Sequence, residues 1–320
     1  MREILSLPSK SLIVTIPITL LIGFITGLFV NTSFLKDYIL AFTFFMIYPT
    51  MIGFKIQEAV NLSYMKIVFV IAILNFIVIP LVAIGFGKAF FADSPMLIVG
   101  IVMMSLFPTS GMTISWTMLN KGNVAAAIKI TAISLLLGSF LAPVYLYVIV
   151  GALVEVDIMQ TVMTVLQIVI LPMLLGHITY KVYMRSHSLQ EFNTVLKPLL
   201  PGVSTWGMVF IVFSSVSMKA KVLVSNPSVL LLITGVLVLF YLINFSISTL
   251  LGRWMFNRAD AYAVVYGTVM RNLSIALGLA VASFGSDTAL LVTIAFIIQV
   301  QIAAWYGKIS SKYNWLGVSA

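Results

Sequence analysis

Long apolar runs fill most of this sequence, and they limit the chain to one class of fold. Each run is about 20 residues long, the length that an α-helix needs to cross a bilayer. Their approximate limits are 11–31, 37–54, 66–86, 95–119, 124–151, 158–181, 199–217, 227–251, 261–283 and 288–308. Because the runs are continuous rather than alternating, they favour helices over a barrel. Only 8% of the residues are charged, against about 25% in a soluble domain. The sequence therefore predicts an all-α membrane protein with ten transmembrane helices and no separate soluble domain.

Lysine and arginine are distributed unevenly between alternate connections. One side would hold Arg2, Lys10, Lys55, Lys66, Lys121, Lys181, Arg185, Lys197, Arg253, Arg258, Lys308 and Lys312, and the other Lys36, Lys88, Lys219 and Lys221. Because cytoplasmic loops are enriched in these residues, we expect a multi-pass protein of the cell membrane with both termini in the cytoplasm. Met1–Lys10 resembles the start of a signal peptide, but no small-residue cleavage site follows, so we expect a retained first helix. Topology accounts for the net charge of +9, and no nucleic-acid partner is expected.

The two halves of the chain resemble each other weakly, in a consistent order. Residues 21–26 match residues 174–179, Asn75 matches Asn244, and Gly122 matches Gly285. Five helices per half is an odd number, so the second half would be inverted in the membrane, as in many secondary transporters. The predicted domains are a first inverted repeat, 1–157, and a second, 158–320.

Polar residues interrupt the fourth and ninth apolar runs, which correspond in the two halves. The fourth contains Pro108, which removes a backbone hydrogen bond, and Gly111, which loosens the chain. The ninth contains Arg271, a charge that costs about 2.5–3.5 kcal/mol at the bilayer centre even on lenient scales. Paired discontinuous helices point to a binding site. The candidate substrate-binding residues are Thr109, Ser110, Thr113, Arg271, Asn272 and Ser274. A simple proline kink and an arginine that snorkels or pairs structurally are the alternatives.

The residues around these two breaks resemble the superfamily of bile acid:sodium symporters and arsenite efflux permeases. Pro108–Trp116 with Asn120–Asn123 is similar to the helix 4 signature of the arsenite branch, and Met270–Ala276 to the helix 9 signature of both branches. The resemblance implies panel and core domains, with helices 4 and 9 crossing in the core.

This sequence departs from that superfamily at positions that matter for the transported species. Thr109 stands where the arsenite permeases have an essential cysteine, and the chain contains no cysteine at all. Gly267 and Arg271 stand where the sodium symporters have a glutamate and a glutamine. Thr131 keeps the position of a sodium-ligating hydroxyl, whereas Ala127 replaces a serine. The resemblance thus leaves the coupling ion, sodium or proton, open.

The ionisable residues point to an anion as the transported solute. All nine acids fall in loops or near the ends of the expected helices, which leaves Arg271 and Lys129 without obvious partners. A planar guanidinium suits a carboxylate. The candidates for ion binding or coupling are Lys129, Thr131, Asn75, Asn244 and Gln299. For Lys129 the alternative is snorkelling, for the two asparagines it is interhelical hydrogen bonding, and for Gln299 it is a helix contact.

The sequence therefore predicts a secondary active transporter of a small anionic solute, most simply an organic one, that works by alternating access. The lipid bilayer and the solute are its expected partners. No cofactor and no metal are expected, because two histidines are too few for a metal cluster. Neither a catalytic dyad nor a set of metal ligands can be assembled, so no enzyme is predicted. The alternative is a membrane sensor or uncoupled binding protein that keeps a transporter fold.

Overall fold

The computed structural model describes residues 12–53, 63–107, 109, 111–151, 158–225 and 227–317. Every regular element in these ranges is helical, and they contain no strand, so the all-α prediction is confirmed. The predictions for Met1–Lys10, for Lys55 and for the boundary between residues 157 and 158 fall wholly or partly outside the described residues.

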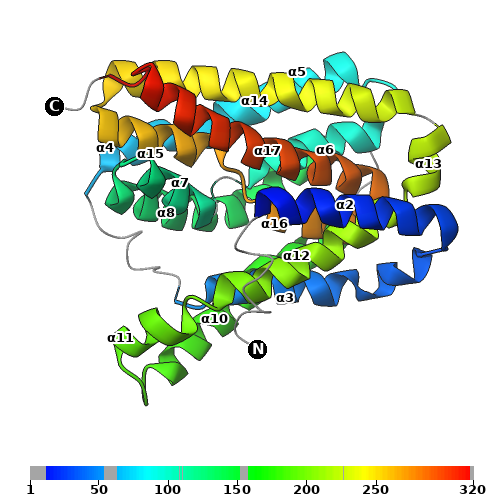
Figure 1. Cartoon of the computed structure of the whole chain (residues 1–320), viewed down its shortest axis with the longest axis horizontal. Coiled ribbons are helices and arrows are strands. Elements are labelled where there is room, and N and C mark those ends of the chain that lie inside the picture. Colours follow the sequence, from blue (N-terminus) through cyan, green and yellow to red (C-terminus); the bar gives the residue numbers. More distant parts are fainter. Residues whose placement is uncertain are drawn as a thin grey trace. The chain divides into compact units, whose positions relative to one another are not determined.

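Each predicted apolar segment coincides with one helix or with a short series of helices (Figure 1). In chain order these are α2 (Leu12–Phe29); η1 and α3 (Ser33–Tyr38, Ile39–Met51); α4, η3 and α5 (Met65–Ile73, Leu74–Val78, Ile79–Phe90); α6 and α7 (Pro95–Leu106, Gly111–Leu119); α8 and η4 (Val124–Tyr145, Leu146–Val150); α9, η5 and α10 (Ile158–Val165, Leu166–Ile170, Leu171–Tyr183); α12 (Leu200–Ser217); α14 (Pro227–Met255); α15, α16 and η7 (Arg258–Val269, Leu273–Leu279, Ala280–Phe284); and α17 (Ser286–Lys312). The elements α11 (Leu189–Glu191), η6 (Phe192–Leu196) and α13 (Ala220–Ser225) lie before and after α12.

Five helical stretches are long and apolar enough to cross a membrane: Met65–Phe90, Val162–Tyr183, Leu189–Ser217, Pro227–Met255 and Ser286–Lys312. A bent pair, Val124–Gly138 and Phe140–Val148, would make a sixth. Shorter apolar helices include Pro95–Leu106 and Leu273–Phe284, which are parts of the two interrupted segments. The structure thus describes a multi-pass membrane protein, and the count of ten crossings stays a prediction.

The chain forms two compact units, and each unit draws on both halves of the sequence. Unit 1 comprises Met1–Phe54, Val156–Leu230 and Ser274–Thr293, and unit 2 comprises Lys55–Glu155, Leu231–Leu273 and Ile294–Ala320. The predicted repeats, 1–157 and 158–320, describe internal similarity rather than compactness, so this division does not test them.

In unit 1, α12 packs closely against α2 and α3. The spacing requires glycine at two contacts. A Cβ on Gly27 of α2 would lie 2.0 Å from the carbonyl oxygen of Ser217, and one on Gly207 of α12 would lie 2.8 Å from the Cα of Met46. Small residues at helix contacts let backbones approach in this way in membrane proteins, where packing replaces the hydrophobic effect.

In unit 2, α15 packs against α4, α7 and α8; it is buried from Ala261 to Val269, and its first turn is half-buried. Apolar side chains of α4, α8 and α15 form one cluster, to which Ile71, Ile130 and Val264 belong. Asn123 caps α8 by accepting from the Ala126 amide, and its Nδ2 donates to Asp260 near the start of α15. Because the starts of α8 and α15 are joined in this way, the following residues of both helices are held in register.

Candidate functional site

The first interruption lies between α6 and α7. Helix α6 ends at Leu106 and α7 begins at Gly111. Between them Thr109 has a positive φ of 61°, a conformation that is an outlier for a β-branched residue. Its side chain is 1% exposed, and its hydroxyl has no hydrogen-bond partner. Pro108 and Ser110 lie outside the described residues, so the structure says nothing of the candidate Ser110.

The second interruption lies between α15 and α16. Helix α15 ends at Val269, Met270 has extended backbone angles, and α16 begins at Leu273. Arg271 sits in this gap and is only 1% exposed. Helix α15 has 12 residues, about 18 Å at about 1.5 Å per residue, so the arginine lies far from the helix start at Arg258.

The two interruptions meet and satisfy each other's backbone groups. The last carbonyls of a helix have no partner within it. At the end of α6, Ser105 O accepts from Arg271 Nη1 at 3.2 Å, and Phe107 O accepts from the Asn272 amide at 2.7 Å. At the end of α15, Tyr266 O accepts from the Met270 amide at 3.2 Å and also from Thr113 Oγ1 of α7 at 3.3 Å. Residues from each interruption therefore cap the helix that ends at the other.

Gln299 of α17 forms hydrogen bonds with both the amide and the carbonyl of Arg271. Its Oε1 accepts from the Arg271 amide at 2.8 Å, and its Nε2 donates to the Arg271 carbonyl at 3.2 Å. Tyr241 of α14 also donates to Oε1, at 3.1 Å. Both lone pairs of Oε1 are thus used by protein donors, which favours a positioning role for Gln299 over ligation of an ion.

The guanidinium of Arg271 has no counter-charge in the part of the chain that the structure describes. Among the described residues no carboxylate lies within ion-pair distance of it; the ion pairs present there are His187–Glu191 and Lys219–Asp287. Its Nη2 is fully buried and has no hydrogen-bond partner. A buried charge of this kind costs several kcal/mol unless a partner is supplied.

Asn75, a candidate for ion binding or coupling, lies near the end of α15. It belongs to the π-helical turn η3, and its Nδ2 donates to Gly267 O at 2.9 Å. Its Oδ1 is buried and unpartnered. Asn75 therefore contributes to the capping of α15 and still presents an unused acceptor.

The other candidates for ion binding or coupling are buried in unit 2 and have different surroundings. Thr131 donates to Ala127 O within α8 at 2.8 Å. Asn244 of α14 is 1% exposed, and its Oδ1 has no partner. Lys129 of α8 is 2% exposed, and its ammonium donates to Ser63 O, just before α4 begins. Gln299 is the candidate for ion binding or coupling that hydrogen-bonds to Arg271 in the described structure.

Ser274, the last of the substrate-binding candidates, is half-buried at the second position of α16. It belongs to unit 1, whereas Thr109, Thr113, Arg271 and Asn272 belong to unit 2. Ser274 is therefore described in a different unit from these four candidates.

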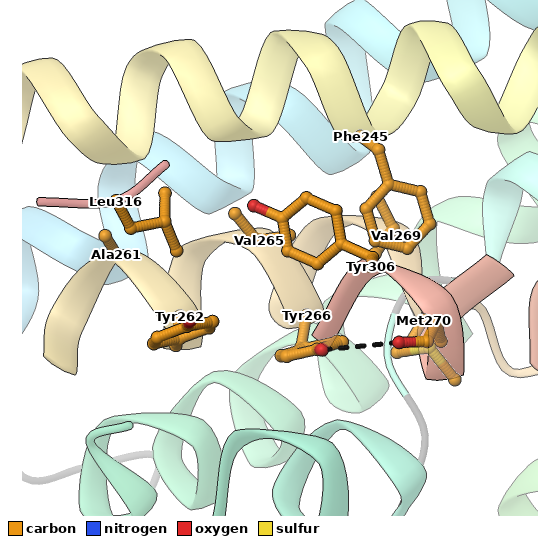
Figure 2. Packing of buried hydrophobic residues seen from close by; sticks show 10 residues of the cluster. Phe245, Ala261, Tyr262, Val265, Tyr266, Val269, Met270, Tyr306 and Leu316 are labelled. Atoms are coloured by element: carbon orange, nitrogen blue, oxygen red, sulfur yellow. Dashed lines mark hydrogen bonds between the residues drawn. The ribbon is translucent and has the colours of Figure 1, made fainter. Parts of the chain in front are cut away.

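Aromatic residues line α15 on the way to the interruption (Figure 2). Tyr262 and Tyr266 stack with ring centroids 6.3 Å apart, and Tyr266 stacks in turn on Trp116 of α7 at 6.2 Å. The Tyr266 hydroxyl accepts from Asn120 Nδ2 at 3.0 Å and donates to Ala303 O at 3.4 Å. These contacts join α15 to both α7 and α17.

Sequence reasoning missed two partners of the site. Ser105 acts through its carbonyl, which no side-chain motif reveals, although its place in the last turn of α6 marks that carbonyl as unpaired. Tyr241 lies three residues before Asn244 on α14, a spacing that puts both on one helix face. From the sequence, that spacing could have indicated that Tyr241 lies near the site.

Interrupted helices among apolar, membrane-length helices are typical of secondary transporters. The model of the Sodium Bile acid symporter family matches residues 40–226, more than half of the chain. The chain belongs to this family.

Two similar proteins come from Bacillus subtilis (strain 168). "Uncharacterized sodium-dependent transporter YocS" is 30% identical over 238 residues, which cover 73% of this chain and 69% of that protein. "Uncharacterized protein YbaS" is 24% identical over 249 residues, 74% and 76% of the two chains. A third, "Arsenical-resistance protein Acr3" of Alkaliphilus metalliredigens (strain QYMF), is 21% identical over 282 residues, 83% and 79% of the two chains. The resemblance to both branches of the superfamily is thus confirmed.

Proposed function

We propose that this protein is a secondary active transporter for a small anionic solute, most simply a carboxylate, which binds where the interruptions of α6–α7 and α15–α16 meet. The buried, unpartnered Nη2 of Arg271 carries this proposal. A guanidinium presents two N–H groups side by side that match the two oxygens of a carboxylate. A bound anion would therefore supply both the missing hydrogen bond and the missing counter-charge.

Thr109 and the start of α7 would complete the anion site. The Thr109 hydroxyl is buried without a partner at the same junction. Helix α7 begins two residues later, at Gly111, and the first amides of a helix attract anions. Arsenite bound as a thiolate adduct is not proposed, because the chain contains no cysteine.

The membrane arrangement that we propose has ten crossings in two inverted repeats, 1–157 and 158–320, with helices 4 and 9 crossing at the two interruptions. The hydrogen bonds between α6 and the α15–α16 gap support this crossing. Both termini would lie in the cytoplasm. Alternating access would then expose the crossing to each side in turn.

Uptake by proteoliposomes tests the role of Arg271. The probes are radiolabelled pyruvate, succinate, ethanesulfonate and sulfate, each with and without sodium. We expect wild-type uptake of at least one probe. Because a charge-assisted hydrogen bond contributes about 1.5–3 kcal/mol, Arg271→Ala should lower uptake by about tenfold or more. Arg271→Lys should retain part of it. Arg253→Ala, on the exposed last turn of α14, is the matched control.

Two outcomes would contradict the proposal. Unchanged uptake in Arg271→Ala would remove the arginine from the site. Stabilisation of the purified wild-type protein by a probe, with no uptake or counterflow of that probe, would favour the sensor or uncoupled binding protein instead.

A further inference from the structure

We propose that this carrier works as an anion exchanger, which returns across the membrane rapidly only with another anion bound. The inference rests on the proposed function, and it concerns what the empty site can do. It follows from the charge of Arg271 and from the absence of a counter-charge for it among the described residues.

The charge at the site is permanent. An arginine guanidinium is not deprotonated in proteins, so the empty site cannot become neutral by releasing a proton, as a buried lysine can. The site therefore carries one positive charge when it is empty and no net charge when it holds a monovalent anion.

The protein supplies no anionic group of its own to Arg271 in the described part of unit 2. The buried charged side chains there are Lys129 and Arg271, which are both positive. Asp93 is exposed, and Asp260 is half-buried with its two oxygens accepting from Asn123 and Asn257. The end of α6 offers a partial negative charge through Ser105 O, which offsets only part of the cost of a buried cation.

The backbone that carries the guanidinium is held in place by hydrogen bonds. Gln299 holds the amide and the carbonyl of Arg271, and Tyr241 holds Gln299 in turn. Since Nη2 is buried and unpartnered, a closed state without an anion would contain a dehydrated charge, which a bound anion would neutralise. Passage through the closed state is therefore slower without an anion.

Uptake of the anion would then be driven by exchange for another anion rather than by a co-transported cation. The contacts of Gly267 are in keeping with this. A Cβ there would lie 3.1 Å from methyl carbons of both Ile71 and Ile130, so an acidic side chain at the end of α15 would require both isoleucine side chains to shift.

Trans-stimulation in proteoliposomes tests the inference. Wild-type vesicles are loaded either with the fastest-transported member of the panel of pyruvate, succinate, ethanesulfonate and sulfate, or with sucrose of equal osmolarity. Uptake of the same labelled anion is then measured without sodium. We expect at least tenfold faster uptake into the anion-loaded vesicles. With a monovalent probe, a potassium–valinomycin potential should not change the exchange rate, because one charge leaves for each that enters.

The outcomes separate the two proposals. Equal uptake into sucrose-loaded and anion-loaded vesicles overturns the exchange mechanism and leaves the proposed function intact. Absence of uptake of every probe under both conditions, with or without sodium, overturns the proposed function itself. Arg271→Lys should keep the stimulation at neutral pH. In Arg271→Gln, the ratio of uptake into anion-loaded vesicles to uptake into sucrose-loaded vesicles should fall towards one in whatever uptake remains. An unchanged ratio in Arg271→Gln contradicts the role of the charge.

Discussion

The backbone conformation of Thr109 and the burial of the Arg271 charge both cost free energy, and the contacts of the described structure do not fully offset that cost. A left-handed backbone costs a residue with a Cβ about 1–2 kcal/mol, and Thr109 adds an unpartnered buried hydroxyl to that strain. Strained residues persist where the surrounding structure requires them, and such residues cluster at ligand sites. Their joint presence at one junction of interrupted helices is therefore the residue-scale support for the anion site that we propose.

Replacing Thr109 by valine separates ligand binding from packing. Valine is also β-branched, so it keeps the side-chain shape and the strain but removes the hydroxyl. We expect the unfolding temperature of Thr109→Val to stay the same or rise, since an unpartnered buried polar group is lost. Anion uptake should show a KM raised about fivefold, which corresponds to one hydrogen bond of about 1 kcal/mol.

Thr117→Val is the matched control for this prediction. Thr117 lies in α7, is fully buried, and also has a hydroxyl without a partner. We expect the same effect on stability and no effect on KM. Equal changes in KM for the two variants would show that the Thr109 hydroxyl has no special part in binding.

At the scale of elements, the helices use two different kinds of contact. In unit 2 the interrupted helices are joined by backbone hydrogen bonds, such as that from the Asn272 amide to Phe107 O at 2.7 Å. In unit 1 the uninterrupted helices α2 and α12 approach closely through glycine. Polar junctions can be rearranged when a ligand supplies new partners, whereas a contact between backbones admits no extra atom. We therefore expect the glycine contacts between α2 and α12 to tolerate less substitution than the polar junction in unit 2.

A single added methyl group tests the contact between α2 and α12. In Gly27→Ala the new Cβ would lie 2.0 Å from Ser217 O, so the helices must separate, and overpacking of this kind costs about 1–3 kcal/mol. Heating in detergent followed by size-exclusion chromatography should show a lower midpoint of unfolding.

Gly235→Ala in α14 is the control, because nothing lies within 4 Å of a Cβ there. The same substitution should leave stability unchanged or raise it by up to about 1 kcal/mol, through helix propensity alone. A Gly27→Ala protein as stable as the wild type would mean that α2 and α12 do not approach as described.

At the scale of the whole molecule, the arrangement in the membrane is the main prediction still to be tested. The chain has no cysteine, so single cysteines can be introduced without altering the background. We expect Lys88→Cys and Lys221→Cys to react with a membrane-impermeant maleimide in intact cells. Lys121→Cys and Lys197→Cys should react only after the membrane is opened, because the charge bias places them in the cytoplasm.

Labelling of all four positions from outside, or of both pairs in the reverse order, would contradict cytoplasmic termini. Labelling of Lys121→Cys but not of Lys88→Cys in intact cells would show that the first half of the chain has the opposite orientation to the one predicted. That result would remove the case for an even number of crossings.

The sequence by itself determined the all-α class, the apolar segments and the two interruptions, because these depend on local composition and on residues such as Pro108, Gly111 and Arg271. Helix length and hydrophobicity are properties of neighbouring residues, so they can be read without knowing the fold. The family also followed from local motifs, those around the same interruptions.

Only the tertiary structure decided what Arg271 contacts. Its partners, Ser105 O and the amide of Gln299, are 166 and 28 residues away along the chain, and one of them is a backbone atom that any residue type would offer. The sequence left open whether this charge was paired, since pairing depends on which helix ends meet. The folded chain brings the ends of α6 and α15 together with no carboxylate between them in the described residues, and that arrangement leaves Nη2 unpartnered.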